Sequence, residues 1–186
     1  MKPEKNNYKN HPYTSASLVT RNKAEWKYAR IEVRAKLPTG RGTWPAIWML
    51  ETNIDEVGWP ACGEIDIMEN VGFDPNIIHA NIHTEAYNHT LGTNNGNGMQ
   101  VHKPYEKFVT YSVEWLPNRI TFFIGDEAYF SFSKDSNDPA VWPFDQKFYL
   151  IINAAIGGSW GGQQGIDDSI FPQQYLVDYV RVYKQK

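Results

Sequence analysis

Residues Gly63–Asn70 read GEIDIMEN, a short segment in which acidic and apolar side chains alternate. Successive side chains of a β-strand point to opposite faces of the sheet, so Glu64 and Asp66 share one face and the isoleucines beside them share the other. In a regular strand Glu69 would fall on the apolar face. A β-bulge at Met68 would return it to the acidic face, because a bulge adds one residue to its strand. We therefore expect a bulged strand with three carboxylates on one face and the core on the other.

Three carboxylates on one face of a sheet repel one another, and this crowding raises the pKa of at least one of them. Glycosidic bonds are usually hydrolysed by two carboxyl groups, one ionised and one protonated. In retaining enzymes these groups lie about 5–5.5 Å apart. The spacing of Glu64 and Glu69 on a bulged strand fits that geometry, with Asp66 between them. Two other interpretations stay open at this point, a solvent-facing acidic strand and a Ca²⁺ or Mg²⁺ site built from carboxylates.

The rest of the sequence is also typical of β-structure. Period-two alternation or a short apolar run predicts strands at Ile31–Leu37, Val109–Trp115, Ile120–Ile124, Ala128–Ser133, Phe148–Ile156 and Tyr179–Tyr183. The third and fourth of these read as a hairpin joined across Gly125-Asp126-Glu127, and the fifth as a strand buried on both faces. The sequence contains no convincing amphipathic helix. Many short strands separated by Gly, Pro and Asn predict an all-β sandwich or barrel.

Two segments read as loops. Glu51–Pro60 precedes the acidic strand, and Tyr87–Pro104 is rich in Asn and Gly with little periodicity. Within the second, Asn88-His89-Thr90 matches a glycosylation acceptor, which we discount because such triplets arise by chance. The single cysteine, Cys62, excludes an internal disulfide and is expected to be a small buried residue.

Composition excludes several classes of protein. The 186 residues suit one domain, and a net charge of −3 without a basic stripe argues against nucleic-acid binding. The sequence has no apolar run of about 18–20 residues, the length of a membrane-spanning helix. The first ten residues, MKPEKNNYKN, lack the apolar core of a signal peptide.

Four blocks in order carry a resemblance to a known family: ARIEVRAKLPTGRGTWPAIWML (Ala29–Leu50), GEIDIMEN, INAAIGGSWGG (Ile152–Gly162) and VDYVRVY (Val177–Tyr183). From Tyr13 to its end the chain resembles glycoside hydrolase family 16, particularly the laminarinase-like branch with a bulged E-x-D-x-x-E motif. The resemblance implies that Glu64 is the nucleophile, Glu69 the acid/base and Asp66 the assisting carboxylate. It also implies a jelly-roll β-sandwich of two curved antiparallel sheets, like that of concanavalin A, with a substrate cleft on the concave face.

Tryptophans supply the expected sugar platform, because the apolar faces of sugar rings stack on indole. Trp44 and Trp48 are four residues apart on one predicted strand and would share a face about 13 Å apart. Trp142 and Trp160 lie in Gly/Pro-rich segments that would present them at the rim of a cleft. Each could instead be a core residue; the resemblance favours substrate binding for all four. The remaining tryptophans are left unassigned or in the core: Trp26, Trp59 and Trp115.

Polar residues on two further strands complete the expected cleft. In Ile77–His83, the side chains of His79, Asn81 and His83 share one face. His83 resembles the family's cleft histidine, placed to hydrogen-bond the substrate or the acid/base. Asn153 is the one polar residue of its apolar run, and a buried amide needs a partner. The resemblance places Asn153 in the cleft.

The chain begins later than the resemblance leads us to expect. Family domains open with strands ahead of the equivalent of Tyr13, and those strands carry substrate-contacting residues and an acidic calcium ligand. We expect residues 1–12 to form a polar tail and residues 13–186 a single domain that lacks its first strands. Asp178 matches the family's other calcium-ligating acid, but alone it is a weak candidate, since Ca²⁺ takes six or more oxygens. The edge left by the missing strands predicts lower stability or self-association.

The resemblance therefore implies a retaining endo-β-1,3-glucanase that acts on a polysaccharide and needs no cofactor for its chemistry. One alternative is a hydrolase of mixed-linkage β-glucan or red-algal galactan. Another is a catalytically impaired carbohydrate-binding sandwich, and a purely structural protein is the least favoured. A polymeric substrate implies an extracellular or cell-surface location, although the chain carries no signal segment.

Overall fold

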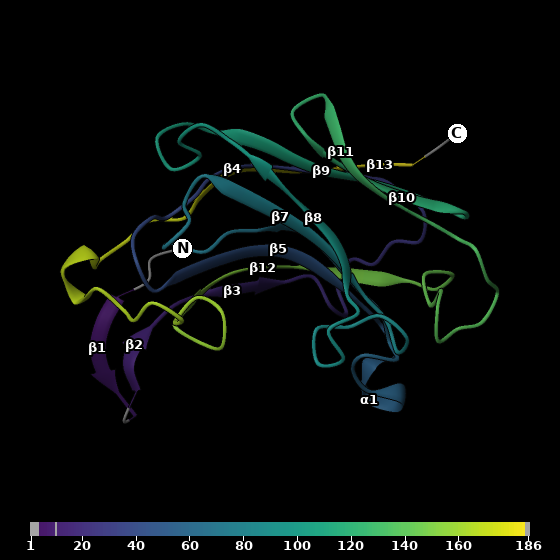
Figure 1. Ribbon diagram of the computed structural model, residues 1–186, viewed down its shortest axis with the longest axis horizontal. Coiled ribbons are helices and arrows are strands. Elements are labelled where there is room, and N and C mark those ends of the chain that lie inside the picture. Colours follow the sequence, from purple (N-terminus) through teal and green to yellow (C-terminus); the bar gives the residue numbers. More distant parts are fainter. Residues whose placement is uncertain (1–3, 10, 185–186) are drawn as a thin grey trace.

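The computed structural model of the chain describes residues 4–9 and 11–184. The described strands form two large antiparallel sheets, stacked one on the other, and a separate hairpin (Figure 1). The five-stranded sheet has the order β11 (Glu127–Ser133), β10 (Arg119–Ile124), β9 (Val109–Leu116), β4 (Arg30–Lys36) and β13 (Leu176–Tyr183). The six-stranded sheet has the order β3 (Ser17–Val19), β12 (Phe148–Ile156), β5 (Thr43–Glu51), β6 (Glu64–Glu69), β7 (Ile77–His83) and β8 (Asn95–Gln100). The hairpin pairs β1 (Glu4–Tyr8) with β2 (His11–Thr14).

The core lies between the two large sheets because the strands alternate as predicted. In β4 every second residue is buried, and Ile31 and Val33 are fully enclosed. They face the apolar side of the other sheet, where Ile47 and Met49 of β5 are equally enclosed. The opposite face of the six-stranded sheet is therefore free to carry polar and aromatic side chains.

The hairpin of β10 and β11 forms where the sequence predicts it. Ile124 pairs with Glu127 across a two-residue turn, in which Gly125 has a positive φ of 61°. Glycine adopts this backbone conformation without the steric cost of a Cβ atom, as short hairpin turns require.

The prediction of a polar tail over residues 1–12 is corrected, because this segment contains β1 and the start of β2. Strands β1 and β2 pair from Glu4 opposite Thr14 to Tyr8 opposite His11. Strand pairing rests on backbone hydrogen bonds, so it needs no apolar alternation that a sequence would reveal. The hairpin is tied to the domain by Tyr13, whose ring lies 5.4 Å from that of Phe171.

Both predicted loops contain regular structure. Glu51–Pro60 includes α1 (Ile54–Val57), a single helical turn. The segment predicted as a long loop, Tyr87–Pro104, contains the edge strand β8. This strand was not predicted because Asn and Gly are typical of turns. The glycine is needed here for another reason: Gly96 lies so close to β7 that an added Cβ would be 2.5 Å from the carbonyl oxygen of Ala80. In the part of the chain that the structure describes, no helix is long and apolar enough to cross a membrane.

Candidate active site

The outer face of the six-stranded sheet holds a cavity of about 660 Å³. Strands β5, β6, β7 and β12 form its floor, and the loops after β7 and β12 form its walls. The lining side chains are Trp44, Ala46, Trp48, Glu64, Asp66, Glu69, His79, Asn81, His83, His89, Asn94, Asn153, Ala155, Ser159, Trp160 and Gln163. Carboxylates, amides and imidazoles among tryptophans are suited to a ligand with both polar groups and apolar faces.

A bulge in β6 brings the third carboxylate into this cavity. Between Asp66 and Glu69 the register shifts, so that Ile67 and Met68 together oppose the single residue Ala80 of β7. Both bulge side chains are buried in the core. Glu69 therefore faces the cavity together with Asp66, which confirms the predicted bulge. The bulge involves Ile67 as well as Met68, whereas the prediction placed it at Met68 alone.

Glu64 is held from two sides. The indole Nε1 of Trp59 donates a hydrogen bond of 3.0 Å to its Oε2, and the His83 Nε2 lies 3.7 Å from its Oε1. Burial and the neighbouring charge of Asp66 raise the pKa of Glu64 well above its ordinary value. His83 and the Trp59 hydrogen bond act in the opposite direction by stabilising the anion.

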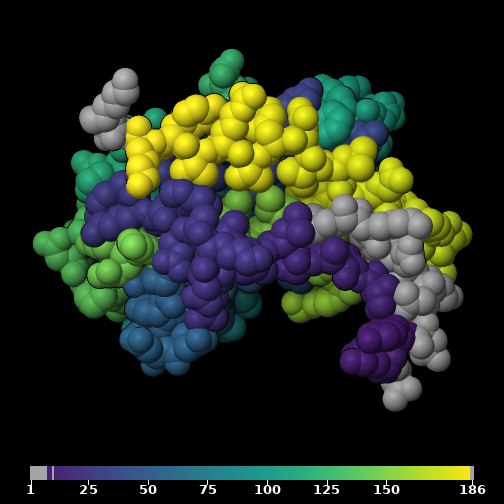
Figure 2. All heavy atoms as spheres, turned by 180° about the vertical axis from the view of Figure 1, so that it is seen from behind, coloured from purple at the N-terminus to yellow at the C-terminus, as the bar shows by residue number. Residues whose placement is uncertain are grey.

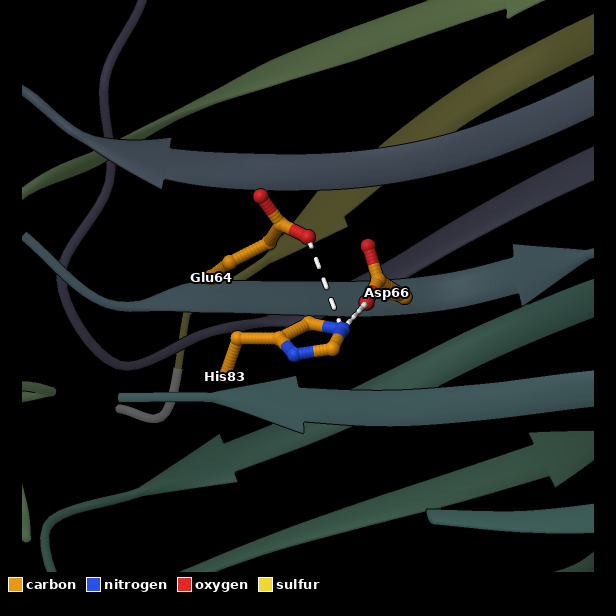
Figure 3. Close-up of side chains that lie close together, drawn as sticks. All are labelled: Glu64, Asp66 and His83. Carbon is orange, nitrogen blue, oxygen red and sulfur yellow. Dashed lines mark ion pairs between the residues drawn. The ribbon is translucent and has the colours of Figure 1, made fainter. Parts of the chain in front are cut away.

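Asp66 lies deeper, and Figure 3 shows its carboxyl group and that of Glu64 converging on the His83 ring from the neighbouring strand. Its Oδ2 is 3.2 Å from the His83 Nε2. Burial and the charge of Glu69 raise the pKa of Asp66 well above its ordinary value, and a hydrogen bond with Glu64 opposes this rise. Since three carboxyl groups lie together, they share protons and titrate as a unit.

Glu69 accepts one hydrogen bond at each oxygen. Trp44 Nε1 donates to Oε1 at 3.0 Å, and Asn81 Nδ2 donates to Oε2 at 2.9 Å. Burial raises the pKa of Glu69, while these two hydrogen bonds oppose that rise. A buried carboxyl group with a raised pKa can carry a proton near neutral pH and release it again, as an acid/base catalyst must.

Comparison with known proteins identifies the architecture. Residues 3–181 match the model of glycosyl hydrolases family 16. The chain belongs to this family. It is 52% identical over 184 residues to the β-glucanase of Rhodothermus marinus, a match that covers 95% of this chain and 64% of that protein. The chain thus spans slightly less than two thirds of the length of this curated relative.

Solved structures of family 16 proteins superpose closely on this domain. The laminarinase of Rhodothermus marinus gives a TM-score of 0.96 at 49% identity, covering 99% of this chain and 76% of that one. SCLam, described as a non-specific endo-β-1,3(4)-glucanase, gives 0.95 at 44% identity, covering 100% and 71%. The predicted family and the predicted jelly roll of two antiparallel sheets are both confirmed.

Five of the six predicted substrate-binding side chains line the cavity of this family 16 domain: Trp44, Trp48, His83, Asn153 and Trp160. Trp48 Nε1 donates to the Asn153 Oδ1 at 2.6 Å, so the half-buried Asn153 side chain has the hydrogen-bond partner that was expected of it. Trp160 packs edge-on against Trp44, with ring centroids 5.8 Å apart. Their contacts with a sugar stay predictions.

Trp142 does not belong to this set. Only 2% of it is exposed, and its ring stacks on Phe132 in the core with centroids 5.5 Å apart. Its indole N–H donates to Asp145. The proline that follows Trp142 suggested a cleft-rim loop, but the segment turns the indole inward. The structure therefore corrects this prediction.

Sequence reasoning missed three side chains that touch the carboxylates or their neighbours; two of them, Asn81 and His89, line the cavity. Asn81 binds Glu69, Trp59 binds Glu64, and His89 packs on Trp59 with ring centroids 5.0 Å apart. The alternation in Ile77–His83 placed Asn81 on the correct face and could have identified it. Trp59 and His89 lie in loops, where no periodicity indicates the direction of a side chain.

The predicted calcium candidate lies outside the cavity. Asp178 is on β13, where its Oδ2 forms an ion pair of 2.5 Å with the guanidinium of Arg34. Because Ca²⁺ takes six or more oxygen ligands, a lone carboxylate already bound to a cation does not fit such a site. Among the described residues, three potential metal-ligating side chains meet only at Glu64, Asp66 and His83.

Proposed function

We propose that this chain is a retaining endo-β-1,3-glucanase in which Glu64 is the nucleophile and Glu69 the acid/base. The observation that carries the proposal is the bulge of β6. It places Glu64 and Glu69 in the same cavity, each with one oxygen bound by an indole N–H. Two carboxyl groups facing one cavity from a single strand are suited to double displacement at a sugar carbon.

The reaction proceeds in two steps. Protonated Glu69 gives its proton to the glycosidic oxygen while the Glu64 carboxylate attacks the anomeric carbon, so that the leaving chain departs and a glycosyl ester forms on Glu64. Ionised Glu69 then takes a proton from water as that water attacks the same carbon and releases Glu64. The Trp44 and Asn81 hydrogen bonds stabilise the Glu69 anion between the steps. Asp66 hydrogen-bonds to the nucleophile when protonated and raises the pKa of Glu69 when ionised.

Trp44, Trp48 and Trp160 support a glucan as the substrate. Their side chains line the cavity that holds the carboxylates, where indole faces can stack on glucose rings. The similar proteins named laminarinase and β-glucanase favour β-1,3-linked glucan. The mechanism uses carboxyl groups and water alone and requires no metal or organic cofactor.

A polymeric substrate also bears on location and partners. Polysaccharides too large to enter a cell would be met outside it, so we propose an extracellular or cell-surface site of action. We further propose that the molecule associates with itself through the sheet edges formed by β3 and β13.

A second candidate is hydrolysis of mixed-linkage β-glucan. The solved structure of SCLam, described as a non-specific endo-β-1,3(4)-glucanase, favours it. Red-algal galactan and binding without turnover are outcomes that the same experiment separates.

The test measures reducing-sugar release from laminarin, mixed-linkage glucan and agarose by the chain and by Glu64→Ala. Laminarin should be hydrolysed fastest, and the variant should be inactive on every polymer. Proton NMR of the first products should show the β-anomer, since double displacement retains configuration. Folded protein that binds laminarin without cleaving it would make the chain a carbohydrate-binding sandwich and refute the enzymatic proposal.

A further inference from the structure

Trp59 connects the nucleophile to the loop that follows β7. Its indole N–H binds Glu64, and one part of its ring packs on the small apolar cluster that includes Leu50, Cys62 and Tyr149. Another part contacts the ring of His89, with centroids 5.0 Å apart and planes inclined at 37°. The position of the indole therefore depends on His89 as well as on the apolar cluster.

His89 is held against two aromatic neighbours. Besides Trp59, it contacts His83 edge-on, with ring centroids 5.2 Å apart. Partial desolvation and the proximity of His83 lower the pKa of His89, which favours the neutral imidazole. A neutral ring in these contacts acts through packing, which a phenyl ring can reproduce.

Asn88 determines where His89 lies. Its side chain is buried, its amide donates to the carbonyl oxygens of Thr84 and Glu85, and its Oδ1 accepts a hydrogen bond from the Leu91 N–H. These bonds close the loop after β7 on itself and direct the adjacent imidazole toward the cavity. They also occupy the amide that the Asn-His-Thr acceptor triplet would expose, which agrees with discounting it.

We propose that His89 is a positioning residue for the nucleophile: its ring, fixed by the loop around Asn88, holds the Trp59 indole in place for its hydrogen bond to Glu64. The inference rests on the proposed function for the role of Glu64. The rival interpretation is that His89, which is exposed at the rim, touches the sugar directly. If His89 acts through Trp59, the kinetic effects of replacing the two residues are not additive. If His89 touches the sugar directly, the effects add.

Kinetics on laminarin separate them. His89→Ala should lower kcat by about threefold to tenfold, the effect of losing one aromatic pair, with KM nearly unchanged. His89→Phe should restore most of that loss. In a Trp59→Phe background, which lacks the indole N–H, His89→Ala should have little further effect. Leu91→Ala is the matched control, because it removes an exposed side chain from the same loop and keeps the backbone N–H that binds Asn88.

A second measurement does not depend on any substrate. Carbon-13 NMR titration of labelled glutamate carboxyl groups, with Glu64→Gln for assignment, follows the ionisation of Glu64 itself. His89→Ala should raise the pKa of Glu64, because a weakened indole hydrogen bond stabilises its anion less; Leu91→Ala should leave it unchanged. The other titratable groups that face Glu64 are Asp66, Glu69, Cys62 and His83, and they are the same in both variants.

The outcomes are distinct. A raised KM for His89→Ala, with effects that add to those of Trp59→Phe and an unchanged titration of Glu64, would overturn the proposal in favour of a sugar contact. If no polymer is hydrolysed, the proposed function fails, while the titration still decides whether His89 acts on Glu64 through Trp59.

Discussion

At the residue scale, the cavity gives similar carboxyl groups different surroundings. Glu64 and Glu69 each accept an indole hydrogen bond, whereas Asp66 is buried with its Oδ2 3.2 Å from the His83 Nε2. Differences of this kind separate the proton affinities of neighbouring carboxyl groups and so separate their roles. Each hydrogen bond to these groups should therefore affect the pH dependence of the reaction as well as its rate.

Replacing Asn81 tests this for the acid/base. Asn81→Leu removes the donor to Glu69 Oε2, which favours the ionised form, so the pKa of Glu69 should rise. The basic limb of the profile of kcat/KM against pH should then move to higher pH, and kcat should fall about tenfold through loss of a charge-assisted hydrogen bond. Asn94→Ala is the control, because Asn94 donates to Asn81 and not to Glu69. A basic limb that stays in place would exclude Glu69 as the acid.

Asp66 should reduce stability in exchange for activity. The pKa of Asp66 is raised in the folded protein, so the folded state binds this proton more tightly than the unfolded state does. The resulting stabilisation is fully present below the pKa of the unfolded state and is lost as the pH rises through the pKa of the folded state. Asp66→Asn mimics the protonated form, so it should unfold at a higher temperature than the parent at pH 8. The gain should be about 1–3 kcal/mol there and should disappear near pH 4. Activity should fall about 10²-fold. Equal stability of the two proteins at pH 8, measured by thermal unfolding, would contradict the argument.

A buried acid outside the cavity allows the same test without loss of activity. Burial raises the pKa of Glu51, on β5, to about 7, partly offset by a hydrogen bond from Asn53. Its stabilising protonated form is therefore lost as the pH rises through about 7. Glu51→Gln should be more stable than the parent at pH 8, equally stable at pH 5, and as active on laminarin. Calorimetry at the two pH values measures the difference.

At the element scale, alternation was enough to predict most of the long strands and the shared face of the three carboxylates, while the jelly roll came from the family resemblance. A strand repeats every two residues, so one bulge accounts for the faces of Glu64, Asp66 and Glu69. Loops lack such a repeat, which is why Trp59 and His89 were missed and Trp142 was assigned to the cleft. Their directions depend on contacts with residues distant in sequence, such as the stacking of Trp142 on Phe132.

Two deletions in β6 test the geometry of the bulge. Without Met68 the strand becomes regular and all three carboxylates still face the cavity, so activity should persist at about 10²-fold below the parent, the cost of a small displacement. Deleting Ile65 instead puts Glu64 and Asp66 on opposite faces and should abolish activity. Both deletions remove one buried apolar side chain, and circular dichroism establishes that each variant folds. Equal activity of the two deletions would refute the assigned faces.

At the scale of the whole molecule, the sandwich is open along one side. Leu18 of β3 pairs with Ile152, a core residue, yet 56% of it is exposed. Val180 of β13 pairs with the fully enclosed Val33, yet 41% of it is exposed. Figure 2 shows β13 (yellow) and the N-terminal segment (purple) on the same face of the molecule. Core-facing side chains at two sheet edges are thus accessible to another molecule.

Such edges favour association, because unpaired strands expose both backbone donors and apolar side chains. We expect the molar mass from light scattering during gel filtration to rise with protein concentration. Leu18→Lys and Val180→Lys should each shift the molecule toward the monomer, since a charge at an edge strand opposes pairing. Lys36→Gln, at the end of the interior strand β4, is the control and should leave the mass unchanged. A mass that stays monomeric at every concentration in the parent protein would show that the open side is tolerated in water and that the edges do not pair.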